Sequence, residues 1–132
     1  MPLVILVRLL PVALAVAAAV AYVIHVEGAK GYPERNALPM LLALGLGLIV
    51  LIRGGGNWTK GGWSWLLGSV GYAVPALGLS LYLHYGFAND VGGMFSDAIY
   101  PYELFRYLPY YTTGAGGIGF AIGWIVGRNI QR

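Results

Sequence analysis

The chain has 132 residues, of which 58% are hydrophobic and only 10% are charged, and its mean hydropathy is +0.71. Globular domains carry about 25% charged residues, so this composition indicates an integral membrane protein and excludes an ordinary water-soluble domain. The net charge is +3, but the basic residues form no cluster, so we expect no nucleic-acid partner. Cysteine is absent, which excludes disulfides, thiolate catalysis and cysteine-based metal sites.

The first apolar stretch covers about residues 2–25 and resembles a signal peptide, because it ends in small residues. A single Arg8 lies inside this apolar sequence, which favours a retained transmembrane helix. We expect Arg8 either to reach the phosphates of the inner leaflet or to form a salt bridge with an acidic group of another subunit. The second half of the stretch carries a small residue at every fourth position: Ala13, Ala17 and Ala21.

The second apolar stretch, about residues 37–52, is close to the minimum length for a transmembrane helix. The glycine-rich segment 53–62 lacks the spacing of a phosphate-binding loop, so we interpret it as a turn between two helices. The third stretch covers about residues 63–84. Its small residues recur at alternating steps of four and three, which predicts close packing against another helix at a small left-handed angle. These small residues are Ser64, Gly68, Gly71, Pro75 and Gly78.

The segment between about residues 85 and 106 mixes apolar side chains with Asn, Asp and Ser, which predicts short helical pieces lying in the membrane interface. The fourth apolar stretch covers about residues 107–128, and one of its faces has almost no side chains. The residues of this face recur every four positions: Ala115, Gly119, Gly123 and Gly127. We expect it to pack against the small alanine face of the first stretch. The opposite, bulky face is expected to contact lipid: Ile118, Phe120, Trp124 and Ile125.

The sequence therefore predicts an all-α membrane protein, a single domain over residues 1–132 with four transmembrane helices. Five of the eight basic residues fall on one side of this arrangement, and Lys30, Arg35 and Arg106 fall on the other; the five are Arg8, Arg53, Lys60, Arg128 and Arg132. All five acidic residues fall on the other side. By the positive-inside rule we expect both termini in the cytoplasm, and we expect the membrane to be a bacterial inner membrane.

Two sets of residues are candidates for binding. His25 and His84 end the first and third helices at the same depth, where they either ligate a haem or a metal ion or are simply interfacial polar residues. The second set consists of possible partner or lipid contacts, although its tyrosines also suit an interfacial aromatic belt. Its members are Arg8, Tyr100, Tyr102, Tyr107 and Tyr110.

No Asp or Glu falls within a predicted span, and proton-coupled transport usually requires one. No nucleophile motif is present either, so we expect no enzyme activity and no cofactor. We expect a small non-catalytic component of a membrane assembly, whose partners are lipid and other membrane subunits or copies of itself. An oligomeric channel or small-solute transporter is the first alternative. A bis-histidine haem-binding anchor for electron transfer is the second.

Overall fold

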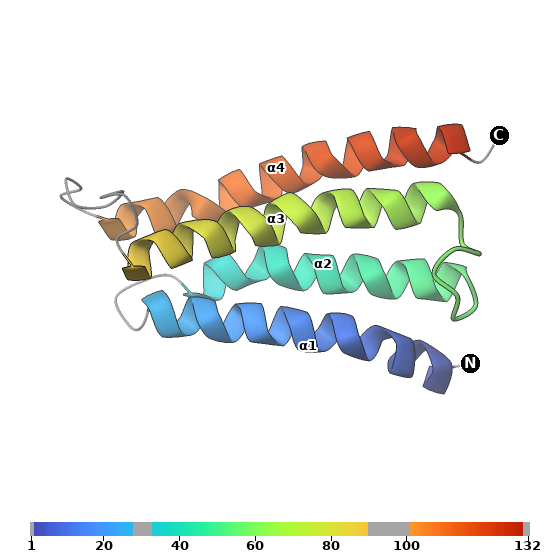
Figure 1. Ribbon diagram of the computed structural model, residues 1–132, viewed down its shortest axis with the longest axis horizontal. Coiled ribbons are helices and arrows are strands. Elements are labelled where there is room, and N and C mark those ends of the chain that lie inside the picture. The colour runs from blue at the N-terminus through green and yellow to red at the C-terminus, as the bar shows by residue number, and fades with distance from the viewer. Residues whose placement is uncertain (1, 28–32, 90–100, 131–132) are drawn as a thin grey trace.

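The computed structural model describes residues 2–27, 33–89 and 101–130, and helices account for nearly all of them (Figure 1). The four helices are α1 (Pro2–Glu27), α2 (Pro33–Arg53), α3 (Trp63–Asn89) and α4 (Pro101–Ile130). Each helix contains the span predicted for it and extends beyond that span at one or both ends. Much of the predicted interfacial stretch belongs instead to the end of α3 and the start of α4. Residues 90–100 of that stretch lie outside the described residues.

Three of the four helices are long and apolar enough to cross a membrane: Leu3–Glu27 in α1, Glu34–Arg53 in α2 and Trp63–Gly86 in α3. The second helix is longer than predicted because the polar residues before its apolar run are also helical, with Glu34 in the first turn. A carboxylate there interacts favourably with the helix dipole. Helix α4 has 30 residues, but its glycines, threonines and tyrosines make it less apolar than the other three.

The helices are arranged side by side in chain order, with α1 against α2, α2 against α3 and α3 against α4 (Figure 1). Neighbouring helices run in opposite directions. Both termini and the α2–α3 turn therefore lie at one end of the bundle, which we call the N/C end. The last turn of α1, the first turn of α2 and the last turns of α3 lie at the other end, which we call the Glu27 end.

The apolar core lies on both sides of α2. Val16, Val23 and Met40 are buried between α1 and α2, and Tyr72 and Ala76 belong to a second buried group where α3 meets α2. The Tyr72 hydroxyl donates a hydrogen bond of 2.9 Å to a backbone carbonyl of α2, so burial leaves no unsatisfied phenol. Because α2 contributes to both groups, it is the central helix of the bundle.

The turn between α2 and α3 is closed by backbone hydrogen bonds rather than by a side-chain core. The Gly56 amide donates a hydrogen bond of 2.8 Å to the carbonyl oxygen of Leu51, and this bond caps the end of α2. Gly55 and Gly56 have φ angles of 61° and 95°, in the region that favours glycine. The turn predicted for residues 53–62 is therefore present, and its first residues cap the C-terminal end of α2.

Candidate functional site

The glycine face of α4 packs directly on the backbone of α3. A Cβ atom added at any of three glycines would overlap an α3 carbonyl group: Gly119 lies on Gly71, Gly123 on Leu67 and Gly127 on Trp63. The prediction that this face packs against the α1 alanines is wrong. The partner is α3 because Gly71 also lacks a side chain, so the two backbones approach from both sides at that level.

The other residues predicted to pack differ in their surroundings. A Cβ at Gly68 would lie 3.0 Å from the Phe120 ring, whereas one at Gly78 would meet no atom within 4 Å. Ala115 is half-buried. Phe120, predicted to face lipid, instead packs on Gly68 because the missing side chain leaves room for its ring.

Trp124, also predicted to face lipid, packs edge-on against Trp65 of α3, with ring centroids 5.2 Å apart. The Ser64 hydroxyl donates a 3.2 Å hydrogen bond to the Trp124 carbonyl beside this contact. The remaining bulky residues of α4, Ile118 and Ile125, are exposed, as a lipid-facing surface requires. One side of the bulky face therefore belongs to the α3–α4 interface.

Arg8 contacts the α2–α3 turn. Its Nη1 donates a 2.6 Å hydrogen bond to the carbonyl oxygen of Gly56, where the positive φ of the glycine turns the backbone. This partner is neither a lipid phosphate nor an acidic residue of another subunit, the two partners predicted for Arg8. Within the chain, this hydrogen bond links the N-terminal half of α1 to the α2–α3 turn at the N/C end of the bundle.

The two histidines lie in different environments, although both are near the Glu27 end. His25 is exposed, whereas His84 is fully buried. The Nε2 atom of His84 lies 2.5 Å from Oε2 of Glu27, which is itself buried. A haem or metal ion on His84 would have to displace this carboxylate, so the geometry does not bring the two histidines together as a ligand pair.

Glu27 and His84 belong to a buried polar cluster that joins three helices. The Asn36 side-chain amide donates a hydrogen bond of 2.8 Å to the same Oε2 of Glu27. On the other side of the imidazole, His84 Nδ1 lies 2.6 Å from the carbonyl oxygen of Ser80. Glu27 is at the end of α1, Asn36 in the first turn of α2 and His84 near the end of α3. The α1 candidate span ends at Glu27 and the α2 candidate span begins at Glu34, so two acidic residues lie at the ends of candidate spans.

Glu27 and His84 form a buried pair at the centre of the cluster. A carbonyl oxygen only accepts hydrogen bonds, so Nδ1 of His84 must carry a proton and donate it to Ser80. The other ring nitrogen, Nε2, faces Oε2 of Glu27, so an acidic and a basic side chain are buried together. Pairing them allows both to be buried, since a lone buried charge would be far more costly.

Helix periodicity contains a signal for this cluster that the sequence-based prediction missed. The buried side of α1 includes Val16, Ala19 and Val23, and Glu27 follows at the next step of four. On α3 the buried residues recur every four positions and end in a histidine: Tyr72, Ala76, Ser80 and His84. Each buried stripe thus ends in a polar residue at the same end of the bundle.

The tyrosines predicted to contact partners or lipid are partly described. Tyr107 and Tyr110 are exposed on α4, Tyr102 falls within α4, and Tyr100 lies outside the described residues. The guanidinium carbon of Arg106 lies 5.6 Å from the centroid of the Tyr107 ring. Tyr110 accepts a 3.2 Å hydrogen bond from Nη2 of Arg35, whose guanidinium also lies 5.6 Å from the ring centroid.

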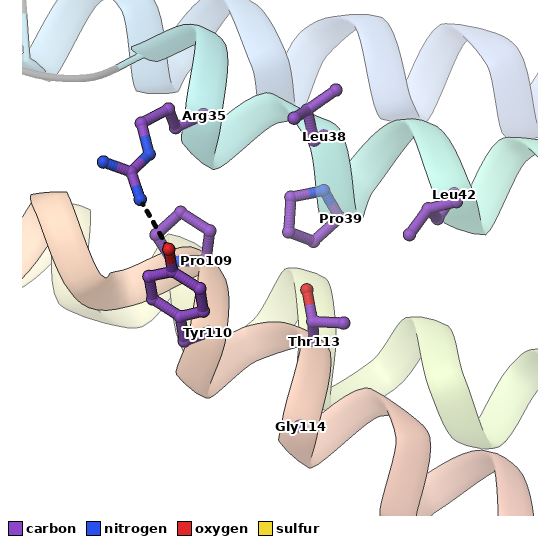
Figure 2. A pocket seen from close by; sticks show the side chains of 8 residues that line it. All are labelled: Arg35, Leu38, Pro39, Leu42, Pro109, Tyr110, Thr113 and Gly114. Carbon is purple, nitrogen blue, oxygen red and sulfur yellow. Dashed lines mark hydrogen bonds between the residues drawn. The ribbon is translucent and has the colours of Figure 1, made fainter.

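Arg35 and Tyr110 are at one end of an apolar groove between α2 and α4, shown in Figure 2. The groove has a volume of about 520 Å³, and four residues from each helix line it. These are Arg35, Leu38, Pro39 and Leu42 of α2, and Pro109, Tyr110, Thr113 and Gly114 of α4. Arg35 and Tyr110 supply polar groups at this end, the Thr113 hydroxyl lies further along α4, and the rest of the lining is mainly apolar.

The fold indicates a helical membrane protein, since three helices are long and apolar enough to cross a bilayer. Comparisons of the chain with protein-family models, with curated proteins and with solved structures found no match. The functional conclusion therefore rests on the chain's own geometry.

Proposed function

We propose that the protein is a small non-catalytic component of a membrane assembly, either as a homo-oligomer or as an accessory subunit of a larger complex. One observation supports this most: the described helices leave most of the small-residue face of α1 uncovered. In the most apolar 18-residue window of α1, 11% of the residues are buried, compared with 44% in α2. Ala17 and Ala21 of this face are exposed.

The α1 face suits contact with another transmembrane helix. The alanines line a groove of about 330 Å³ between α1 and α2, with Leu41 and Leu44 on its α2 side. Small residues concentrate where helices pack closely in lipid, because they allow backbones to approach. The glycine face of α4 already has its partner in α3. The α1 face is therefore our candidate surface for a partner helix.

We further propose that α4 is a fourth span. It packs along α3, which is itself a candidate span, and its glycine face contacts α3 down to Trp63. Arg35 lies beside the start of the α2 candidate span and donates a hydrogen bond to Tyr110, which supports a membrane boundary near Tyr110. From there to the end of α4, residues 110–130 rise about 30 Å, which matches the hydrocarbon thickness of a bilayer.

We propose that the N/C end faces the cytoplasm of a bacterial cell, with the protein in the inner membrane. The basic residues Arg8, Arg53 and Lys60 are at this end, as is Arg128 near the end of α4. The acidic residues Glu27 and Glu34 are near the Glu27 end, as the positive-inside rule allows. A reporter that is active only in the cytoplasm should therefore work when fused after the last residue.

Cysteine cross-linking tests the proposed assembly on a cysteine-free background. Ala17→Cys and Ala21→Cys place a thiol on the small-residue face, and Ala18→Cys places one at nearly the same depth on another face of α1. Oxidation of native membranes should cross-link the Ala17 and Ala21 variants to a second copy if the assembly is a homo-oligomer. A thiol-to-amine reagent should link them to one fixed partner if the protein is an accessory subunit. Equal cross-linking of the Ala18 variant, or none in all three, would contradict the proposal.

A small-solute or proton-coupled transporter is the second candidate, because the Glu27–His84 pair is an ionisable group inside the bundle. In proteoliposomes, a transporter of this kind would lose flux in Glu27→Gln while its assembly persists. Absence of flux in the wild type, together with lower thermal stability of Glu27→Gln, would identify the pair as structural.

A further inference from the structure

We propose that the groove between α2 and α4 binds one anionic phospholipid, with its phosphate at Arg35 and Tyr110 and one acyl chain along the apolar walls. This site is separate from the α1 face proposed for assembly. The inference depends on α2 and α4 lying in the membrane, but not on the protein having a partner.

The polar end of the groove suits a phosphate diester. A guanidinium is a planar fork of donors that matches the geometry of phosphate oxygens and keeps its charge at all physiological pH values. Arg35 Nη2 already donates to the Tyr110 hydroxyl, which orients the two groups toward each other at the groove mouth (Figure 2). The phenolic O–H can then donate to a phosphate oxygen beside the guanidinium.

Charge at the groove mouth favours an anionic headgroup. Among the described residues that line the groove, Arg35 is the one with a charged side chain. The neighbouring Glu34 lines a different groove, which lies against α1 rather than α4. Arg35 is also in the first turns of α2, where the helix dipole adds partial positive charge.

The rest of the groove suits an acyl chain. Leu38 and Leu42 follow Arg35 at steps of three and four along one face of α2, so the wall runs from the membrane boundary toward its interior. On α4, Gly114 contributes no side chain, and a Cβ there would meet no atom within 4 Å. The volume of about 520 Å³ is within the usual range for small-molecule pockets.

Two pairs of matched variants test the site. Arg35→Gln removes the charge at the groove mouth, and Arg106→Gln removes an equal charge from α4 outside the groove lining. Gly114→Leu fills the groove. Gly117→Leu adds the same side chain at another exposed position of α4 where a Cβ would meet no atom within 4 Å.

The measurement is native mass spectrometry of the full chain released from phosphatidylcholine nanodiscs that contain increasing phosphatidylglycerol. We expect one retained phosphatidylglycerol per wild-type protein and about tenfold weaker retention in both Arg35→Gln and Gly114→Leu. The first variant loses a charge-assisted hydrogen bond to the phosphate, and the second loses the space for the acyl chain. Arg106→Gln and Gly117→Leu should behave like the wild type. Thermal unfolding measured in parallel shows whether a variant is folded, and Gly114→Leu tests the site even if Arg35→Gln unfolds.

Three results would overturn the proposal. Equal retention of phosphatidylcholine would exclude selection of an anionic headgroup. Equal losses within either matched pair would mean that general surface charge or bulk, not the groove, controls retention. Binding of inorganic phosphate or of glycerophosphoglycerol as tight as that of the lipid would mean that no acyl chain is held.

Discussion

Gly119→Ala should weaken the α3–α4 interface, whereas Gly117→Ala on the same helix should not. A methyl group at position 119 would overlap the carbonyl group of Gly71 and lie 3.1 Å from Cγ of Pro75. The Gly71 carbonyl belongs to the α3 backbone and cannot rotate away as a side chain could. The two helices would therefore have to separate by roughly 1.5 Å to restore ordinary contact distances.

The expected magnitude follows from two opposing effects. Replacing a helical glycine by alanine improves helix propensity by up to about 1 kcal/mol, and this gain should be similar in both variants. Overpacking at position 119 should cost about 1–3 kcal/mol. No atom lies within 4 Å of a Cβ at Gly117, so the difference in unfolding free energy between the two variants isolates the overpacking cost.

Intrinsic tryptophan fluorescence during unfolding in detergent is a suitable assay. Trp65 and Trp124 are in contact across the same interface, with ring centroids 5.2 Å apart, so their emission reports its opening. Gly119→Ala should unfold at a lower temperature than Gly117→Ala. If both variants unfold at the same temperature as each other, the glycine face does not need its close backbone contact, and the reasoning is refuted.

Three further predictions concern the polar contacts. Glu27→Ala and His84→Ala should each lower the unfolding free energy by about 3–5 kcal/mol, because each removes one member of a buried pair, and the double variant should cost much less than the sum. Additive losses would show that the two side chains do not stabilise the fold as a pair. Arg8→Ala should cost about 1 kcal/mol through the lost hydrogen bond to the α2–α3 turn, with Arg8→Lys intermediate, and wild-type stability of Arg8→Ala would show that the bond contributes nothing. Tyr72→Phe should also cost about 1 kcal/mol in thermal unfolding, and an unchanged midpoint would show that the phenol bond to α2 is dispensable.

Local patterns in the sequence predicted the helices well, because apolar runs and turn residues are short-range signals. The prediction of an all-helical membrane protein is confirmed at the level of three helices able to span a membrane. A fourth span stays a prediction, since the glycine and tyrosine content that suits α4 for packing also lowers its hydropathy. Glu27 lies beyond the first apolar stretch of about residues 2–25, although helix periodicity extends the buried stripe of α1 to it.

Long-range partners could not be predicted in the same way. A four-residue repeat identifies a packing face, but α1 and α3 both offer small residues, and only the glycine at position 71 allows backbone contact from both sides. Glu27 and His84 are 57 positions apart, and Arg35 and Tyr110 are 75 apart. Which polar side chains come into contact depends on the depth and rotation of each helix, and these are set by packing rather than by local sequence.

The mass of the particle extracted from native membranes in a mild detergent tests the proposed role in an assembly most directly. Each chain has a mass of 14.1 kDa. Our account predicts a particle that contains several copies or one fixed set of other subunits, and that dissociates when Ala17→Phe fills the α1 face but not when Ala18→Phe does. A single chain carrying only lipid, with the same mass in the wild type and both variants, would contradict it.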